Sequence, residues 1–311
     1  MKISLAVLFT LLTFQMSFGQ NTQLMKEVLS PYEFSSESIA LENGEISYYK
    51  AGKGEKVLLF IHGLSSNADA WQRNIQELQK EYTCIALDLP GHGKSFLQGG
   101  QQTPSYFAKI ILELMEKLGY DKFSLVGHSM GGQAALKFAL LYPEKLEQLI
   151  LVAPAGIEEF TFTEAQMMLA FTTPKALEST SDEQIEKNYH LNFYQFPKEA
   201  EKMVEDRKKI RQASDFSQHM QAVVQSVKGM LIDPVHEQLA EVKVPTLIVF
   251  GQNDALIPNR FLHPQLTLED LAEKARTEIP TSKVVVLPES GHFLMFERPR
   301  EFNEVLRGFI N

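Results

Sequence analysis

Short, mostly apolar runs recur along the chain, separated by longer stretches in which apolar residues have helical spacing. The apolar runs are typical of strands buried on both faces of a parallel sheet, and they cover residues 57–61, 84–87, 123–126, 149–152, 246–250 and 284–287. Helical spacing is found at residues 105–118, 133–141 and 300–310. Because strands that alternate with helices favour right-handed crossovers, the pattern predicts a mostly parallel, doubly wound α/β sheet.

A β-hairpin is expected ahead of the first of these runs. Apolar and polar residues alternate over positions 39–49, and Asn43-Gly44 interrupts the alternation. An Asn-Gly pair between two such segments is a strong signal of a two-residue turn. The chain should therefore begin its sheet with an antiparallel pair of strands.

Residues 157–242 break the alternation, because they show helical periodicity and charge but no convincing strand. We expect this excursion to form a helical cap over the carboxyl edge of the sheet; helices packed on the flank are the alternative. Within it, an apolar stripe is formed by Phe162, Met167, Met168 and Phe171. Core packing is the ordinary role of such a stripe, although a cap over an apolar pocket would use the same side chains.

The N-terminus has the organisation of a secretory signal peptide over residues 1–19. A positively charged start precedes an apolar stretch over 3–14, and Ser17 and Gly19 provide the small residues of a cleavage site. The whole apolar stretch, about sixteen residues, is short for a bilayer span of roughly 20, so an uncleaved anchor is the less favoured alternative. We expect export to the periplasm or the extracellular medium, with 20–311 as the mature domain and no stable membrane span.

Composition narrows the class of protein. Of the 311 residues, 44% are hydrophobic and 22% are charged, which excludes a collagen-like, coiled-coil or mainly disordered chain. The net charge of −9 disfavours nucleic-acid binding, which needs clustered cations. The single cysteine, Cys84, excludes an internal disulfide and a cysteine-rich zinc site, and we expect it to fill space within a strand. Neither a dinucleotide fingerprint nor a P-loop is present, so no cofactor or metal is expected.

The chemistry begins at Gly127-His128-Ser129-Met130-Gly131, a G-x-S-x-G sequence between a predicted strand and a helix-compatible stretch. A serine on such a sharp turn projects its hydroxyl clear of the sheet, and the flanking glycines permit the turn. The N-terminus of the following helix places backbone N–H groups where negative charge would develop. These features predict that Ser129 is a nucleophile; a serine that caps the helix is the alternative.

A nucleophilic serine needs a base, and His292 is the best candidate among the eight histidines. It follows the last predicted strand, at the carboxyl edge where open α/β sheets gather their catalytic groups. Three other histidines are expected in tight loops or packing, namely His62, His92 and His128. Three in the helical excursion are expected to face solvent, namely His190, His219 and His236. His263 has no supporting motif.

The acid that orients this base should follow another strand, between the serine and the histidine in the chain. Asp254 meets this condition, because it comes directly after the predicted strand at 246–250. It would accept the second ring N–H of the histidine, fix its tautomer and stabilise the imidazolium. The competing acids are Glu158, Glu159 and Asp233.

From about Glu42 onward, the chain resembles the α/β-hydrolase superfamily in its capped form. The matching motifs occur in order at 62–64, 88–95, 127–132, 251–254, 290–292 and 296–299, and the order of nucleophile, acid and base also agrees. The resemblance implies that the backbone N–H groups of Leu64 and Met130 form an oxyanion hole. It also implies architectural roles for Asp88 and Ser95. The connection over 259–280 is longer than usual, which leaves one wall of the pocket undefined.

The resemblance also implies a class of reaction. Haloalkane dehalogenases and epoxide hydrolases of the superfamily have an aspartate nucleophile where this chain has Ser129, so these activities are not expected. The GHSMGG sequence is most similar to carboxylesterases and monoacylglycerol-type lipases. It implies cleavage, through an acyl-enzyme, of a carboxylic ester of a small or lipid-like substrate with an apolar acyl part. Two alternatives stay open: a carbon–carbon bond hydrolase, and a catalytically silent ligand-binding protein of the same fold. The sequence leaves the oligomeric state open.

Overall fold

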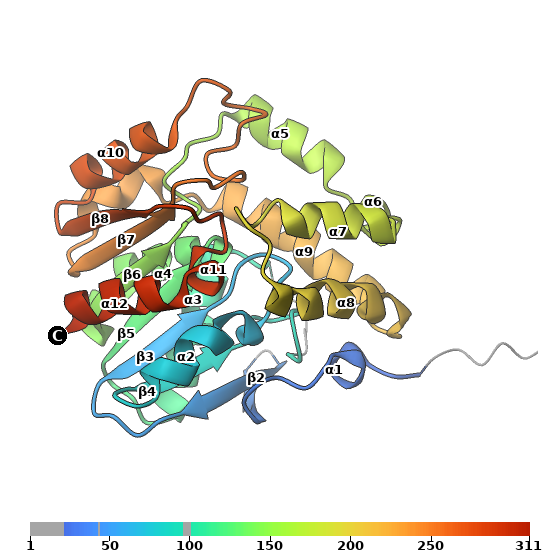
Figure 1. Cartoon of the computed structure of the whole chain (residues 1–311), viewed down its shortest axis with the longest axis horizontal. Helices are drawn as coiled ribbons and strands as arrows, with labels where there is room; N and C mark the ends of the chain where they lie inside the picture. Colours follow the sequence, from blue (N-terminus) through green and yellow to red (C-terminus); the bar gives the residue numbers. More distant parts are fainter. Residues whose placement is uncertain (1–21, 43, 96–100) are drawn as a thin grey trace, which may run out of the picture.

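An eight-stranded sheet organises the fold (Figure 1). The computed structural model describes residues 22–42, 44–95 and 101–311, so the expected signal peptide lies outside the described residues. The strand order is β1-β2-β4-β3-β5-β6-β7-β8. Neighbouring strands are parallel except in the pairs β1–β2 and β2–β4. The prediction of a mostly parallel α/β sheet is therefore confirmed.

Each predicted apolar run lies within a strand. The strands are β1 (Ser36–Leu41), β2 (Gly44–Ala51), β3 (Val57–Ile61), β4 (Thr83–Leu87), β5 (Phe123–His128), β6 (Leu146–Val152), β7 (Thr246–Gly251) and β8 (Ser282–Leu287). The hairpin is present as β1–β2, with Leu41 opposite Gly44. The prediction that the strand at 284–287 is buried on both faces was wrong. Residues 284–286 are only half-buried, because β8 is an edge strand with a single strand neighbour.

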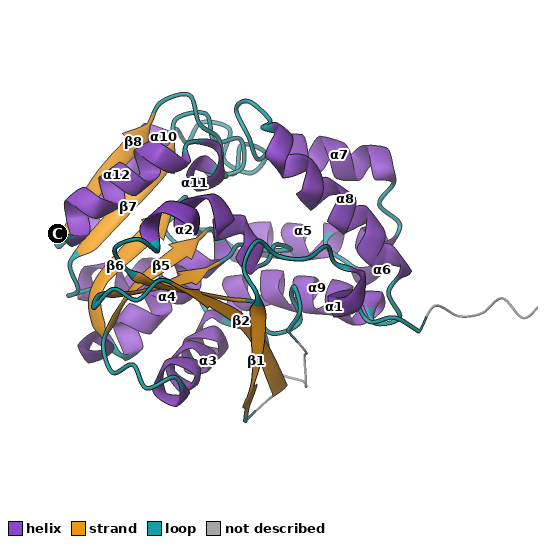
Figure 2. Cartoon of the chain, turned by 60° about the horizontal axis from the view of Figure 1, so that its bottom comes forward, coloured by secondary structure: helices purple, strands orange, loops and turns teal. Residues whose placement is uncertain are grey.

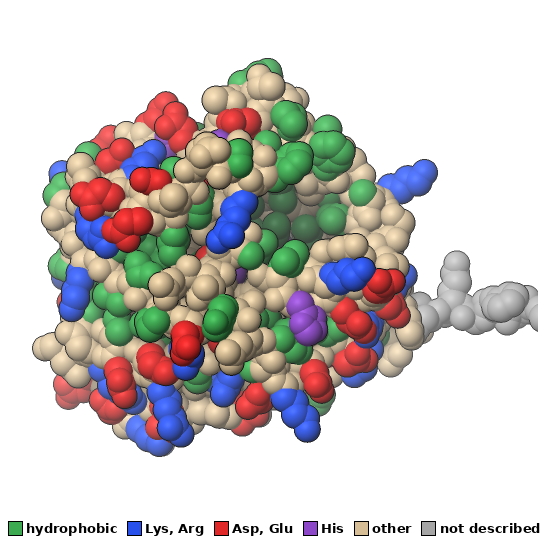
Figure 3. Space-filling model, turned by 45° about the horizontal axis from the view of Figure 1, so that its top comes forward, with side chains coloured by type: hydrophobic (Ala, Val, Ile, Leu, Met, Phe, Trp, Pro, Cys, Tyr) green, Lys and Arg blue, Asp and Glu red, His purple; other side chains and the backbone are tan. Residues whose placement is uncertain are grey.

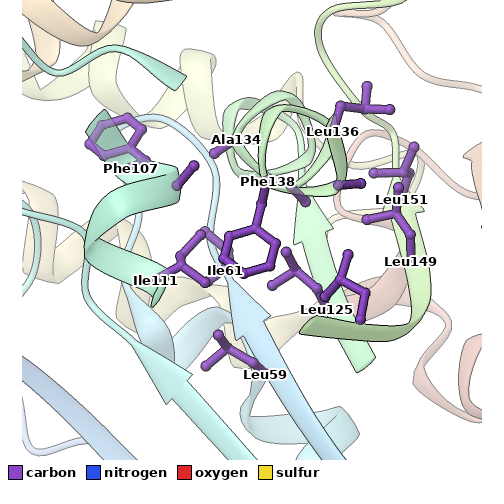
Figure 4. Packing of buried hydrophobic residues seen from close by; sticks show 14 of the residues in the cluster. Leu59, Ile61, Phe107, Ile111, Leu125, Ala134, Leu136, Phe138, Leu149 and Leu151 are labelled. Carbon is purple, nitrogen blue, oxygen red and sulfur yellow. The ribbon is translucent and has the colours of Figure 1, made fainter. Parts of the chain in front are cut away.

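Helices cover both faces of the sheet (Figure 2). One face is covered by α3 (Pro104–Lys117), α4 (Met130–Leu141) and α10 (Leu268–Glu278), and the other by α2 (Gln72–Leu78), α11 (Leu294–Glu297) and α12 (Pro299–Ile310). Alternate residues of β3 serve the two cores, since Leu59 and Ile61 join the first and Leu58 and Phe60 the second. Figure 4 shows the first core, where Phe138 of α4 lies against β3. The helices predicted at 105–118, 133–141 and 300–310 correspond to α3, α4 and α12.

Cys84 lies in β4, in the interior of the sheet. Its neighbours across the ladder are Ala51 of β2 and Leu58 of β3, and its side chain is fully buried. Burial raises the pKa of the thiol to about 12. The cysteine therefore fills space in the core, as expected, and is far from being a thiolate at neutral pH.

Between β6 and β7 the chain leaves the sheet and forms a group of helices on one side of the molecule (Figures 1 and 2). These helices are α5 (Phe162–Phe171), α6 (Pro174–Glu178), α7 (Asp182–His190), α8 (Glu201–Lys209) and α9 (Phe216–Ile232). We refer to residues 157–242 as the cap. All of them are described, and they contain no strand. Within the described ranges, no helix combines the length and the apolar character needed to cross a bilayer.

Shorter helices complete the fold. They are α1 (Met25–Val28) and the 3₁₀ helices η1 (Ala68–Trp71), η2 (Pro143–Lys145), η3 (Lys198–Ala200), η4 (Ile210–Gln212) and η5 (His236–Glu241). The segment around α1 packs on the cap, where Met25 and Leu29 join Ile210, Phe216 and Met220 in a separate apolar cluster. The first described residues therefore help to hold the cap.

The interpretation of the apolar stripe in α5 as core packing was wrong. None of the ten residues of this helix is buried, and the side chains of Phe162 and Phe171 are 80% and 75% exposed. Met168 instead lines the cavity that contains Ser129. The stripe fails as a core signal because α5 lies at the margin of the cap and, although it contacts α9, buries none of its side chains.

A row of three buried histidines joins the cap to the sheet. The ring of His92 lies 5.5 Å from the ring of His62 and 5.5 Å from that of His219. His219, on α9, donates from Nδ1 to the carbonyl of Gly91 at 2.8 Å. The expected solvent exposure of His219 was wrong, because the loop that carries Gly91 packs directly against α9.

Acidification is expected to destabilise the fold through these three histidines. Burial lowers the pKa of His62, His92 and His219 to about 3, 4 and 3, against an ordinary value of 6.5, so the unfolded chain binds protons first as the pH falls. Between pH 7 and pH 5, each histidine should remove about 2 kcal/mol from the free energy of unfolding. Burial raises the pKa of Asp88 to about 6, so this carboxyl acts in the opposite direction and offsets about 1 kcal/mol of the summed loss.

Urea unfolding at pH 7, 6 and 5 measures this loss. The variant His219→Asn keeps a side-chain donor for Gly91 but cannot titrate, so its stability should depend less steeply on pH than that of the wild type. His190→Asn, at an exposed position of α7, is the matched control and should retain the wild-type slope. Equal slopes for all three proteins would contradict the assignment.

Candidate active site

Ser129 occupies the sharp turn between β5 and α4. Its backbone has φ 53° and ψ −118°, a left-handed conformation that side chains other than glycine rarely adopt. The turn is possible because neighbouring backbones approach closely: a Cβ on Gly127 would lie 2.3 Å from the carbonyl oxygen of Gly131, and one on Gly131 would lie 2.5 Å from that of His62. The structure therefore has the strand–turn–helix geometry in which a serine hydroxyl stands clear of the sheet.

His292 and Asp254 are brought together from the ends of two other strands. The Nδ1–H of His292 donates to Oδ2 of Asp254 at 2.8 Å, which leaves Nε2 free to accept a proton. Oδ1 of Asp254 accepts the backbone N–H groups of Leu256 and Ile257 at 2.8 and 3.0 Å. Both members of the pair are buried, so their hydrogen bond is shielded from water.

The competing acids make other contacts. Glu158 pairs with His263, Asp233 with Lys137, and Glu159 lies near Lys274 and His236. Among the four candidate acids, Asp254 is therefore the one that contacts His292, as the order of the motifs predicts.

A cavity of about 430 Å³ unites Ser129 and His292. The cap supplies part of its apolar wall, through Met168 of α5 and Val227 and Met230 of α9. Besides Ser129 and His292, the polar lining side chains are those of His128, Gln133, Glu158, Asn192, His236 and Asn259. Figure 3 shows this side of the molecule hollowed, with hydrophobic side chains around and within the hollow. The cavity can enclose an apolar group and still offer polar partners to a reacting centre.

The two residues predicted for an oxyanion hole flank the serine. Met130 is the first residue of α4 and directly follows Ser129. Leu64 follows Gly63 in the loop after β3 and lines the cavity. A Cβ on Gly63 would lie 3.1 Å from the Cβ of Ser129, so this loop runs beside the serine. The role of the two N–H groups stays a prediction.

Replacing Gly63 by alanine is expected to damage catalysis without unfolding the protein. The added methyl group would lie 2.9 Å from Nδ1 of His128 and 3.1 Å from the Cβ of Ser129, so the loop or the serine must shift. A displacement of this size should lower kcat/KM for a p-nitrophenyl ester by about 10- to 100-fold. Gly308→Ala, in α12 where a Cβ would meet open space, is the control. Wild-type kinetics for both variants would contradict the placement of the loop.

The site contains histidines for which the sequence offered no functional signal. His236, expected at the surface, is only partly exposed and lines the cavity. His128 is buried, its ring centroid is 4.8 Å from that of His292, and its Nε2–H donates to the carbonyl of His292 at 3.0 Å. Burial and the neighbouring His292 hold the pKa of His128 well below its usual range. His128 is therefore a neutral support for the backbone of His292.

The long connection after Asp254 forms a wall of the cavity. His263 on this connection contacts Glu158 at 2.6 Å and Glu164 of α5 at 3.2 Å. Burial lowers the pKa of His263, but the two carboxylates outweigh burial and leave the pKa raised. The backbone N–H of Asn259 also donates to Glu158.

In the part of the chain that the structure describes, neither these groups nor any others are arranged to hold a metal ion.

A doubly wound sheet with a serine on a strand-to-helix turn and a His–Asp pair at neighbouring strand ends is the arrangement of an α/β hydrolase. Residues 56–299 match the family model described as the alpha/beta hydrolase fold. The chain therefore belongs to the α/β-hydrolase family, and the protein is a hydrolase of this fold.

Similar proteins catalyse several reactions. The dihydrolipoyllysine-residue acetyltransferase component of the acetoin cleaving system of Cupriavidus necator is 26% identical, over 91% of this chain and 70% of that protein. The 2-hydroxy-6-oxo-6-phenylhexa-2,4-dienoate hydrolase of Burkholderia cepacia is 28% identical, over 93% of this chain and 99% of that protein. The solved structure of a thermophilic esterase from Thermogutta terrifontis is 27% identical in sequence and superposes with a TM-score of 0.70, over 89% of this chain and 98% of that chain. The similar proteins thus include an esterase, a dienoate hydrolase and an acetyltransferase component.

Proposed function

We propose that the protein hydrolyses carboxylic esters with Ser129 as nucleophile, His292 as general base and Asp254 as the acid that orients the base. The observation that carries the proposal is the meeting of Ser129 and the His292–Asp254 pair at one largely apolar cavity. No other described histidine that lines this cavity contacts an aspartate. The combination supports nucleophilic catalysis at a carbonyl group.

The reaction proceeds in two halves. His292 takes the proton of Ser129 as the hydroxyl oxygen attacks the ester carbonyl, and the N–H groups of Leu64 and Met130 stabilise the oxyanion. The intermediate collapses to an acyl-enzyme as protonated His292 gives its proton to the departing alcohol. Water, activated by the same base, then attacks the acyl-enzyme and releases the acid.

The cavity supports a small-molecule substrate with an apolar acyl part. Met168, Val227, Met230 and Leu231 provide apolar walls, and the volume of about 430 Å³ lies within the roughly 300–1,000 Å³ that is usual for small-molecule sites. A series of p-nitrophenyl esters with increasing acyl length, together with the matching anilides, tests the proposal. We expect ester hydrolysis with a clear optimum of acyl length. Absence of hydrolysis across the series would contradict it and favour a ligand-binding role.

Hydrolysis of a carbon–carbon bond is the second candidate, and Arg207 favours it. A cavity of about 230 Å³ shares Leu64, Asn192 and Phe293 with the catalytic cavity and is also lined by Arg207. Nη1 of this guanidinium is buried without a hydrogen-bond partner among the described residues. The residue is partly buried, and Nη2 of the guanidinium already donates to Sδ of Met220 at 3.4 Å. A carboxylate on the substrate would satisfy the remaining Nη1 with a charge-assisted hydrogen bond.

The dienoate named for the Burkholderia cepacia relative carries such a carboxylate. Faster turnover of that vinylogous diketone than of any ester, with loss of the preference in Arg207→Gln, would establish the second candidate over the first. Turnover of esters alone would exclude it.

We also propose that the protein is exported and that residues 1–19 are removed. The charge and apolar pattern of this segment support the proposal. Expression of the full chain in a bacterial host, followed by mass measurement of the protein from periplasm and medium, provides the test. A retained N-terminal methionine on protein confined to the cytoplasm would contradict it.

A further inference from the structure

Glu297 binds the backbone on both sides of the boundary between the cap and the loop that carries His292. Its Oε2 accepts the N–H of Gly291 at 2.8 Å and that of Tyr194 at 3.1 Å, and its Oε1 accepts the N–H of Gln195 at 2.5 Å. Gly291 directly precedes His292, whereas Tyr194 and Gln195 belong to the cap. One carboxylate at the end of α11 therefore holds both segments.

The contact between these two segments is continuous. The N–H of Phe293, directly after His292, donates to the carbonyl of Asn192 at 2.9 Å. A Cβ on Gly291 would lie 2.7 Å from that same oxygen and 2.8 Å from the Cα of Phe193. The rings of Phe193 and Phe293 are 5.4 Å apart. The backbone N–H groups of the residues on either side of His292 are thus bonded to cap residue Asn192 or to the carboxylate that also holds Tyr194 and Gln195.

A carboxylate suits this position for a reason of hydrogen-bond chemistry. The three N–H groups approach two different oxygens, and both oxygens of a carboxylate are acceptors only. No Lys or Arg of the described chain forms an ion pair with Glu297, so its acceptor capacity is directed to the backbone. Hydrogen bonds from N–H groups to an ionised acceptor are stronger than neutral ones.

We propose that Glu297 is a positioning residue for His292 that makes alignment of the base depend on docking of cap residues 192–195. The proposal rests on the catalytic role given to His292 above. Loss of the Glu297 contacts releases Gly291 and the cap segment together, so the imidazole loses its fixed direction towards Ser129. The apolar walls formed by α5 and α9 stay in place, because Glu297 contacts neither helix. Asn192 and Phe293, which also line the cavity, adjoin the released segments but keep the backbone hydrogen bond that joins them.

Glu297→Gln provides the mild test, because it keeps the shape of the side chain. In either orientation its amide NH₂ faces at least one backbone N–H, so at least one of the three hydrogen bonds is lost. We expect kcat for a p-nitrophenyl ester to fall about 10-fold, and about 100-fold in Glu297→Ala, with KM changed less than about twofold, because misalignment of a catalytic group weakens the transition state and not substrate binding. The acid limb of the pH profile of kcat should also move in Glu297→Gln, because the surroundings of the base change.

Glu301→Gln is the matched control. Glu301 is on α12, pairs with Arg298 and has a half-exposed side chain, so its removal should leave kcat and the pH profile unchanged. Thermal unfolding of all variants shows whether any loss of activity reflects loss of fold. If Glu297→Ala does not fold, Glu297→Gln decides the outcome.

A measurement independent of any substrate separates this inference from the proposed function. The proton shared by Nδ1 of His292 and Asp254 should give a low-field proton NMR signal, and its exchange with water should be at least about 10-fold faster in Glu297→Gln, as expected when a buried hydrogen bond opens more often. This result would support the inference even if the wild type hydrolyses no ester. Unchanged exchange and unchanged kcat would overturn it, and so would a rise in KM with constant kcat, which would assign Glu297 to the shape of the pocket.

Discussion

Replacing Ser129 with alanine is expected to lower kcat for a p-nitrophenyl ester by at least about 10⁴-fold, because removal of a triad nucleophile leaves only binding and oxyanion stabilisation to accelerate the reaction. The fold should persist. Alanine keeps the Cβ of the native residue, so the backbone at φ 53° gains no new strain, and the Ser129 hydroxyl forms none of the side-chain hydrogen bonds that hold the turn in the described chain.

Ser124→Ala is the control for this variant. Ser124 belongs to β5, the strand that directly precedes Ser129, and its hydroxyl donates to Gln148 at 3.4 Å, away from the catalytic cavity. It should retain the wild-type rate. If Ser129→Ala turned over a substrate at the wild-type rate, Ser129 would be excluded as the nucleophile for that reaction.

Asp254→Asn is expected to lower kcat by about 10³- to 10⁴-fold, because an amide in place of the carboxylate favours the wrong tautomer of the base. In the native protein Oδ2 accepts the Nδ1–H of His292. In the variant the side-chain NH₂ can take that place and donate to Nδ1, which moves the ring proton to Nε2 and removes the acceptor that Ser129 needs. The N–H groups of Leu256 and Ile257, held by Oδ1, favour this orientation of the amide.

Glu158→Gln provides the comparison, because Glu158 also lines the cavity and also pairs with a histidine, His263. We expect less than a tenfold change in kcat, since its partner does not face Ser129 in a triad. A larger loss in Glu158→Gln than in Asp254→Asn would reverse the assignment of the acid. Stopped assays of both variants at several pH values measure the difference.

The parts of the structure that the sequence predicts best are those set by short stretches of chain. The runs that became β3, β5 and β7 are mostly apolar, and β3 is apolar at every position, a pattern that is typical of parallel strands buried on both faces. Ser129 directly follows β5, whereas Asp254 lies in the loop after β7 and His292 in the loop after β8, and these parallel strands have their carboxyl ends at one edge of the sheet. The order of elements was therefore enough to predict that the three residues converge.

The parts that escaped prediction depend on contacts between distant segments. His219 is buried because α9 meets the loop at Gly91, and His263 is engaged because the connection after β7 folds back on Glu158 and α5. No local pattern encodes either meeting. The stripe in α5 misled for a related reason, since periodicity shows that a helix has an apolar face but not what lies opposite that face.

The reactivity of Cys84 reports on whether the centre of the sheet is closed or open. A thiol reagent cannot reach this residue while β2, β4 and β3 stay paired, so the rate of modification measures how often the centre of the sheet opens. Since the chain has one cysteine, the signal is unambiguous and needs no engineered label. The same purified sample can thus give the frequency of opening and the rate of turnover for every variant described above. Comparison of the two rates then distinguishes a variant with a catalytic defect from a variant whose sheet opens more often.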